Sequence, residues 1–228
     1  MVRKTGKLTG EADKWKYPYI ISNHLRYCMI VVVDYHMGNL SSIVKAFNRL
    51  KVPIHVTNNS SEIGRSKKII LPGVGHFGKA METLQQEGLV TTLNELVIYK
   101  KVPIMGICLG MQLMARYSEE GNARGFGWLN ASVVRFKTNQ VKVPHMGWNT
   151  VEIKNNLLNL PAELNNQEFY FSHSYHWQSH DGTEAIGMTK YEYPFASIVA
   201  KDNIIGLQFH PEKSHQQGLR LLKFFIEL

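Results

Sequence analysis

The sequence predicts an α/β protein in which helices flank an open, mostly parallel sheet, with antiparallel strands in the C-terminal half. Short apolar runs alternate with helical periodicity from Met29 to about residue 118, a pattern typical of parallel strands buried on both faces and joined by helices. After that point glycines and short alternating runs follow, which favour antiparallel or mixed strands. A length of 228 residues fits one domain of this kind.

The first half is expected to supply the parallel strands. Residues 29–33 are continuously apolar and lead into a turn that ends at Asn39. Asn39 fits a helix N-cap, because apolar residues recur at helical spacing after it. Further strands are expected at residues 54–56, 68–71 and 102–107. After the strand at residues 68–71, a helical pattern is expected at Met81, Leu84, Leu89 and Leu93. After the strand at residues 102–107, a helix is expected to reach Tyr117.

The second half is expected to hold shorter strands and a closing helix. No internal repeat or low-complexity tract divides the chain, so we expect one domain. The expected strands are residues 131–136, 150–153, 169–171, 195–200 and 204–209, and the closing helix carries Leu219, Leu222, Phe225 and Ile226.

The composition excludes several classes of protein. Hydrophobic residues make up 44% and charged residues 19% of the chain, as in a folded globular protein. No apolar run approaches the roughly 20 residues that span a bilayer. The net charge of +8 is mild, and no basic stripe is interleaved with aromatic residues. We therefore expect neither a membrane nor a nucleic-acid partner.

Residues 1–28 differ from the rest of the chain. They contain six basic and two acidic residues, and so hold half of the net charge. They lack the apolar core of a secretory signal, and they are too acidic and too poor in serine for a transit peptide. We expect residues 1–28 to be an extension outside the core fold and residues 29–228 to form the domain, with Met29 as an alternative start of translation.

The cysteines indicate a reducing, cytoplasmic compartment. Cys28 and Cys108 are the two cysteines of the sequence, and one lies in the expected extension. A disulfide framework is therefore excluded, and Cys108 is expected to be a free thiol.

Cys108 has the sequence setting of a nucleophile. Gly106 and Gly110 flank it as Gly-x-Cys-x-Gly, the thiol counterpart of the nucleophile elbow in which a strand turns sharply into a helix. The N–H groups and positive dipole of a helix N-terminus favour the thiolate. The alternative is a buried structural cysteine beside a glycine-rich turn.

A base and an orienting group for this thiol are found near the C-terminus. His210 and Glu212 follow the expected strand 204–209, and residues two apart in an extended segment face the same way. The imidazole can exchange a proton near neutral pH while the carboxylate fixes its tautomer. Together with Cys108 they predict a catalytic triad.

The turn at residues 72–78 has two interpretations. It follows a strand and offers backbone N–H groups, as an oxyanion hole requires. Its glycines also match the dinucleotide fingerprint Gly-x-Gly-x-x-Gly. However, two strands precede it and no acidic residue ends a strand about 20 residues later, so the oxyanion hole is favoured.

Histidines at residues 173, 176 and 180 raise the question of a metal site. In one continuous strand His173 and His176 would face opposite sides, and no carboxylate accompanies them at ligand spacing, so no metal is predicted. Trp148 lies in a loop that contains glycine and proline, where it either packs locally or forms a contact surface.

Taken together, these motifs resemble the class I, triad-type glutamine amidotransferases. The resemblance covers the chain from about Met29 to the C-terminus. The loops at residues 34–39 and 144–149 narrow it to the glutaminase subunit of imidazole glycerol phosphate synthase. The amidotransferase motifs are Gly-Ile-Cys-Leu-Gly-Met-Gln at residues 106–112, Pro-Gly-Val-Gly-His-Phe-Gly at 72–78 and Gln-Phe-His-Pro-Glu-Lys-Ser at 208–214.

The resemblance implies a flavodoxin-like topology and a Cys-His-Glu mechanism without cofactor or metal. Cys108 would attack the side-chain amide of L-glutamine, and His210, held by Glu212, would protonate the departing ammonia and then activate water. The other implied roles are an oxyanion hole at Val74 and Gly75, glutamine binding by Gly73, Gln112, Ser174 and Tyr175, and a partner interface at Trp148, Tyr170 and Lys213.

The implied partner is a (β/α)8-barrel cyclase subunit. It would receive the ammonia within a heterodimer and make imidazole glycerol phosphate and aminoimidazole carboxamide ribotide in histidine biosynthesis. A related group supplies sugar-amidating enzymes of surface polysaccharide pathways, and the core motifs do not separate the two. The chain departs from the family pattern at His36, where glycine is usual, and in residues 1–28.

Two further functions compete with an ammonia-supplying enzyme. A non-catalytic scaffold is disfavoured by the complete set of Cys108, His210 and Glu212. A cysteine hydrolase for peptides or γ-glutamyl bonds is disfavoured by the loop at residues 144–149, which indicates a synthase partner.

Overall fold

The computed structural model describes residues 30–155 and 157–228. The expected extension, residues 1–28, and Met29 lie outside the described residues. No helix in the described part of the chain is long and apolar enough to cross a membrane.

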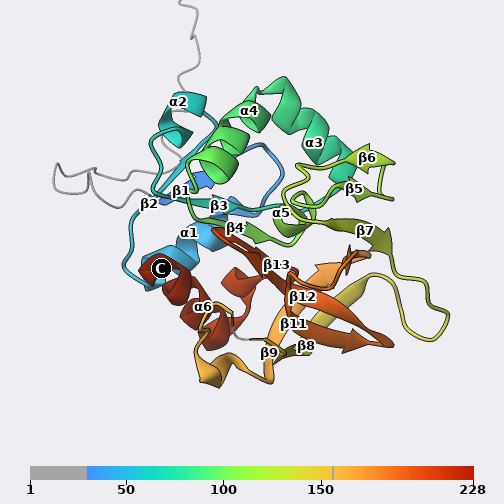
Figure 1. Ribbon diagram of the computed structural model, residues 1–228. Coiled ribbons are helices and arrows are strands. Elements are labelled where there is room, and N and C mark those ends of the chain that lie inside the picture. Colours follow the sequence, from blue (N-terminus) through green and yellow to red (C-terminus); the bar gives the residue numbers. More distant parts are fainter. Residues whose placement is uncertain (1–29, 156) are drawn as a thin grey trace, which may run out of the picture.

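Parallel strands form the centre of the described molecule (Figure 1). All of these strands pair in parallel, and numbered along the chain their order is 2-1-3-4-5, which is the flavodoxin-like order. The predicted fold class is therefore confirmed. The strands lie in the order β2 (Ile54–Thr57), β1 (Ile30–Val33), β3 (Lys68–Leu71), β4 (Ile104–Ile107) and β13 (Ile204–Leu207).

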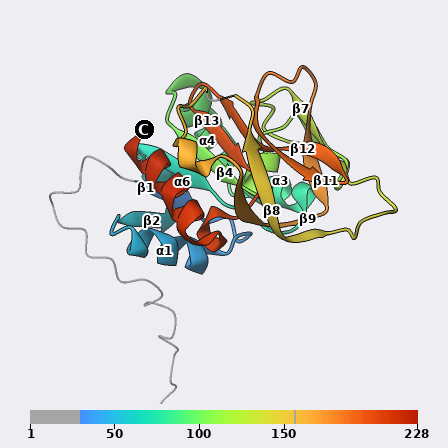
Figure 2. The same ribbon diagram turned by 90° about the horizontal axis from the view of Figure 1, so that it is seen from below.

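Helices cover both faces of this sheet, because alternate strand residues face opposite cores. Ile30 and Val32 of β1 pack in one cluster with Phe47 and Phe225, whereas Val31 and Val33 pack in the other. Figure 2 shows α1 (Leu40–Arg49) and α6 (His215–Glu227) on the side of the sheet that faces the viewer. The opposite side is covered by α3 (Phe77–Gln86) and α4 (Leu89–Asn94).

The C-terminal half extends the sheet with antiparallel strands. Strand β12 (Tyr193–Lys201) pairs with β13 on one side and divides the sheet into two branches on the other. One branch continues through β10 (Tyr175–Ser179), β7 (Ala131–Arg135), β5 (Tyr117–Ser118) and β6 (Ala123–Arg124). The second branch runs through β11 (Ala185–Tyr191) and β8 (His145–Ile153) to β9 (Gln167–His173).

Several predicted boundaries are wrong for identifiable reasons. The helix expected to reach Tyr117 ends at Gln112, because later backbone N–H groups bind the carbonyl groups that would continue it: Phe126 donates to Leu113 at 2.8 Å. The helical pattern at Met81–Leu93 is two helices, interrupted by Gly88 in the left-handed region at φ 70°. The single-turn α2 (Ser60–Ile63) and strands β5, β6 and β11 were not predicted. Strand β8 was expected at residues 150–153 but begins at His145, where it pairs with β9, so Trp148 lies in a strand and not in the expected loop.

Candidate active site

Cys108 stands at the turn from β4 into α5 (Leu109–Gln112). Its φ of 53° and ψ of −108° lie outside the usual regions for a side-chain-bearing residue, which is the strain of a nucleophile elbow. The two flanking glycines make this turn possible. A Cβ at Gly110 would lie 1.9 Å from the Leu71 carbonyl oxygen, and one at Gly106 would lie 2.6 Å from the Gly110 carbonyl oxygen.

His210 and Glu212 form a buried pair. His210 Nδ1 lies 2.9 Å from Glu212 Oε1, and each side chain is 2% exposed. The second carboxylate oxygen, Oε2, has no hydrogen-bond partner among the described residues. The expected extended geometry is wrong: β13 ends at Leu207, and Glu212 lies in a 3-10 turn, η3 (Pro211–Lys213), which still brings it onto the imidazole.

The electrostatics favour a protonated His210. Burial alone would lower the pKa of His210. The negative charge and hydrogen bond of Cys108, with those of Glu212, outweigh burial and raise it to about 10. The site therefore holds a proton next to the sulfur, where a leaving group needs one.

The turn at residues 72–78 packs directly against the elbow. Gly73 has no room for a side chain, since a Cβ would lie 2.5 Å from Tyr35 Oη and 2.8 Å from Leu109 Cβ. This close packing, rather than phosphate binding, accounts for the first glycine of the fingerprint. The Tyr35 hydroxyl donates to the Pro72 carbonyl oxygen at 2.6 Å and fixes the turn.

Val74 and Gly75 border the cavity, but the Val74 N–H is engaged. It donates to the Met37 carbonyl oxygen at 3.2 Å, and Gly75 adopts φ 111°, which favours glycine. An oxyanion hole that uses the Val74 N–H requires that bond to open. The oxyanion role of both residues stays a prediction.

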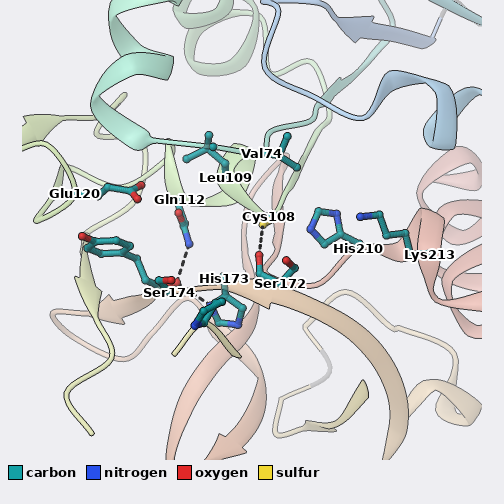
Figure 3. Close-up of a pocket in the computed structure, with 13 residues that line it drawn as sticks. Val74, Cys108, Leu109, Gln112, Glu120, Ser172, His173, Ser174, His210 and Lys213 are labelled. Atoms are coloured by element: carbon teal, nitrogen blue, oxygen red, sulfur yellow. Dashed lines mark hydrogen bonds between the residues drawn. The ribbon is translucent and has the colours of Figure 1, made fainter. Parts of the chain in front are cut away.

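A cavity of about 250 Å³ surrounds Cys108. Figure 3 shows Cys108 between His210 on one side and Gln112 on the other, with Ser172 facing the sulfur. Gln112 Nε2 donates to the Tyr175 carbonyl oxygen at 2.9 Å and to Gln208 Oε1 at 3.0 Å. Because both hydrogens are used, Gln112 meets a bound ligand through its Oε1 acceptor.

Most of the predicted site residues meet in this cavity. Its lining includes Val74, Gly75, Cys108, Gln112, Ser174, Tyr175, His210 and also Lys213. Glu212 lies behind His210, and Gly73 lies in the turn beneath the elbow. Trp148 and Tyr170 do not line the cavity, so Lys213 connects the cavity with the predicted partner surface.

Several further residues at the cavity were not predicted from the sequence. Glu120 lines it, and its Oε2 accepts the Phe77 N–H at 2.8 Å at the start of α3. Glu120 lies between β5 and β6, two strands that were not predicted. Gln208 Nε2 lies 3.8 Å from Cys108 Sγ, and the two-residue spacing from His210 was the signal for it. Ser172 and His173 also line the cavity.

An aromatic and cationic cluster lies at the predicted partner surface. Trp148 is 44% exposed, and its ring stacks on His215 with centroids 4.9 Å apart. Tyr170 meets Trp148 edge to face at 6.0 Å, and Lys213 Nζ lies 5.6 Å from the Tyr170 ring centroid. We call Trp148, Tyr170, Lys213 and His215 the aromatic surface.

Two further expectations can be compared with the structure. The strand through His173 and His176 is broken at Ser174, so both rings pack against Phe136, with centroids 5.3 and 4.6 Å away. Residues 30–155 and 157–228 contain no cluster of three His, Cys, Asp or Glu side chains able to hold a metal. His36 has φ 65°, which explains the usual glycine, and its Nε2 lies 2.9 Å from Glu87 Oε1.

Curated relatives share the sequence over most of the chain. Imidazole glycerol phosphate synthase subunit HisH 2 of Methanococcus maripaludis is 46% identical over 202 residues, which cover 87% of this chain and 99% of the relative. Subunit HisH of Methanocaldococcus jannaschii is 45% identical over 201 residues, which cover 88% of this chain and all of the relative.

Solved structures and a family model agree with these relatives. A glutamine amidotransferase structure superposes with a TM-score of 0.69 at 18% identity, covering 86% of this chain and 97% of the other. PurLQS from Thermotoga maritima gives 0.68 at 15% identity, covering 88% and 98%. The family model for class-I glutamine amidotransferases matches residues 31–228. The chain therefore belongs to the class-I glutamine amidotransferase family.

Proposed function

We propose that this protein is the glutaminase subunit of an imidazole glycerol phosphate synthase. The observation that carries the proposal is the cavity that brings Cys108, at a strained strand-to-helix turn, together with the buried His210–Glu212 pair. The relatives at 45–46% identity bear the name of that synthase subunit, which does not favour the sugar-amidating alternative.

The reaction is hydrolysis of glutamine to glutamate and ammonia. Cys108 Sγ bonds to the side-chain amide carbon of glutamine, and the carbonyl oxygen takes the electron pair. As the carbon–nitrogen bond breaks, His210 gives its proton to the nitrogen, so ammonia leaves and a γ-glutamyl thioester remains. Water then gives a proton to His210 and attacks the thioester, which releases glutamate and restores the thiolate. Glu212 keeps the imidazole oriented throughout.

The cavity walls supply the groups that hold glutamine. Gln112 presents its Oε1, and the backbone around Ser174 and Tyr175 lines the same side. Gly73 lets the turn at residues 72–78 approach the elbow closely. Gly75, and Val74 once its N–H leaves the Met37 carbonyl oxygen, would then stabilise the oxyanion. The Glu120 carboxylate suits the ammonium group of an amino-acid substrate.

The ammonia acceptor is a cyclase subunit that docks on the aromatic surface and forms a heterodimer with this chain. Trp148 and Tyr170 are aromatic anchors of the kind that dominate binding energy at interfaces. Lys213 belongs both to this surface and to the cavity, so docking takes place beside the site where ammonia forms.

The test is glutamate release from glutamine by this chain together with the cyclase subunit of its own source. We expect wild type to release glutamate at full rate only when the partner is present. We expect no glutamate release by Cys108→Ala. Cys108→Ala should still form the heterodimer, as measured by gel filtration. Equal glutamate release by wild type and Cys108→Ala would contradict the proposed nucleophile.

We infer further that residues 29–228 form the whole amidotransferase domain in the cytoplasm and that residues 1–28 are an extension outside it. The family model begins at residue 31, which supports this boundary. A chain that starts at Met29 should unfold at the same temperature as the full chain and keep full glutaminase activity with the cyclase. A loss of either would place the boundary elsewhere.

A further inference from the structure

Strand β8 has two faces with different surroundings. Its side chains alternate, so that Met146 and Trp148 are exposed while His145 points inward and is 3% exposed. The outer face carries part of the aromatic surface. On the inner face His145 lies opposite His173 in the β8–β9 pairing, and His173 lines the glutamine cavity.

A chain of hydrogen bonds fixes the protons on both imidazoles. His173 Nδ1 lies 2.8 Å from the Tyr175 carbonyl oxygen, which can only accept, so Nδ1 carries the proton and Nε2 is an acceptor. His145 Nδ1 lies 3.0 Å from that Nε2 and must therefore donate to it. Asn149 Nδ2 donates to the remaining nitrogen, His145 Nε2, at 3.2 Å and to the Lys190 carbonyl oxygen at 3.0 Å.

The surroundings keep both rings neutral. Burial lowers the pKa of His145 to about 4. Burial also lowers the pKa of His173 to about 3, and the nearby charge of His210 adds to the effect. A neutral imidazole has one proton, so each ring is one donor and one acceptor, and the chain has one direction. The rings of Phe136, Phe171 and Tyr191 surround His145.

The chain ends on the cavity wall. The Tyr175 carbonyl oxygen accepts from His173 Nδ1 and from Gln112 Nε2, at 2.8 and 2.9 Å, so both of its lone pairs are used. The Ser174 carbonyl oxygen is held in turn by the Phe136 N–H at 3.1 Å. The backbone at Ser174 and Tyr175, which lines the cavity, is thus held by hydrogen bonds on the side away from it. One of these bonds comes from His173, which is in turn bonded to His145 on β8.

We propose that His145 and His173 are positioning residues for glutamine. Their directed hydrogen-bond chain, from Asn149 to the Tyr175 carbonyl, holds the cavity wall in its glutamine-binding shape and ties that wall to the strand that carries Trp148. The proposal rests on the glutaminase function proposed above. Loss of the chain loosens the wall and weakens glutamine binding, whereas Cys108 and His210, which are not hydrogen-bonded to either imidazole, keep their geometry.

The kinetic test uses the full chain with its cyclase partner. His145→Leu removes the donor to His173, whereas His145→Asn keeps it, because Asn Nδ2 occupies the place of the ring Nδ1. We expect KM for glutamine to rise about 10-fold in His145→Leu, the effect of one lost hydrogen bond. We expect kcat to stay within about twofold of wild type in both variants. In His145→Asn we also expect KM for glutamine to stay close to that of wild type.

His176→Leu is the matched control. It removes a buried histidine that packs on the same Phe136 ring but bonds to Trp177 and Tyr193, away from the cavity. We expect its KM for glutamine to equal that of wild type. An unchanged KM in His145→Leu, or the same KM increase in His176→Leu, would overturn the proposal.

Nitrogen-15 NMR of the histidine rings provides a second test that needs neither partner nor activity. We expect neutral, Nδ1-protonated tautomers on His145 and His173 from pH 5 to 8, in wild type and, for His173, in His145→Asn. An Nε2-protonated tautomer, or protonation of either ring in that range, would overturn the proposal even if His145→Leu does not fold. Failure of the glutaminase function would appear differently, as no glutamate release by wild type.

Discussion

His210 and His173 line the same cavity and are 2% and 6% exposed, yet their environments set opposite charge states. His210 faces Cys108 and the Glu212 carboxylate, and its pKa rises to about 10 despite burial. His173 faces a carbonyl oxygen, a second imidazole and aromatic rings, and its pKa falls to about 3. The partners around each imidazole therefore set its charge, which fits the two proposed roles: proton transfer for His210 and positioning of the cavity wall for His173.

The strongest way to break this contrast is to remove the charge behind His210. In Glu212→Gln the imidazole loses its buried carboxylate and its tautomer control, so it becomes more like His173. We expect kcat for glutamate release to fall roughly 10⁴-fold, as when the acid of a Ser-His-Asp triad is replaced by its amide. Glu227→Gln, which alters an exposed ion pair with Lys223, is the control and should keep full activity. A loss below tenfold would show that Glu212 does not orient His210.

Removing the aromatic packing around His173 tests the other half of the contrast, the burial that keeps this imidazole neutral. Phe136 contacts His145, His173 and His176, with ring centroids 6.3, 5.3 and 4.6 Å away. Phe136→Ala should reduce the free energy of unfolding by roughly 3–5 kcal/mol, through lost burial and the remaining cavity. Urea unfolding followed by circular dichroism measures this change. A loss under about 1 kcal/mol would mean that the ring does not shield the histidines.

The pH dependence of stability should show the contrast directly. Below pH 6.5 the unfolded chain protonates His145 and His173 while the folded chain keeps them neutral down to about pH 4 and 3. The free energy of unfolding therefore falls as pH drops, by up to about 1.4 kcal/mol per pH unit for each histidine. His210 has the opposite sign, because its raised pKa stabilises the folded state below pH 6.5 and that contribution is lost as pH rises towards 10.

Two variants test which histidine causes the loss of stability at acid pH (the acid limb of the stability–pH profile) and which causes the loss at alkaline pH (the alkaline limb). Cys108→Ala removes one of the charges that raise the pKa of His210, so the alkaline loss of stability should be smaller and should be complete at a lower pH. His145→Asn should weaken the acid limb and leave the alkaline limb unchanged. Thermal unfolding from pH 4 to 10 measures both, and a profile that is flat between pH 4 and 6.5 would contradict the neutral state of the two histidines.

An exposed histidine gives the smallest effect and calibrates the comparison. The His36 side chain is 63% exposed and pairs with Glu87, so the pair contributes little. His36→Gly loses that pair but relieves a left-handed backbone at φ 65°. We expect the free energy of unfolding to change by less than about 1 kcal/mol. A larger loss would show that the turn at residues 34–39 depends on the His36–Glu87 pair.

Local patterns were sufficient for much of the fold. Asn39 caps α1 through its side chain, which accepts the Ser42 N–H at 3.3 Å, and β3 has the predicted bounds. Cys108 was predicted to lie at an elbow from the two glycines that flank it. The backbone approaches so closely at this turn that neither Gly106 nor Gly110 has room for a Cβ. Predicted boundaries were wrong where backbone groups of later residues form hydrogen bonds with an element, as at the end of α5. Helix propensity is a local property and does not describe such long-range hydrogen bonds.

The sequence by itself determined the parallel α/β core, the elbow at Cys108 and the residue types of the proposed triad, because strand periodicity, glycine spacing and adjacent charges are local properties. Only the tertiary structure decided how these parts meet. It turned Glu212 onto His210 through a 3-10 turn, engaged the Val74 N–H with Met37, and joined β8 to the cavity through two neutral imidazoles. These features depend on which groups face one another across separate strands, and a pKa or a tautomer follows from those neighbours.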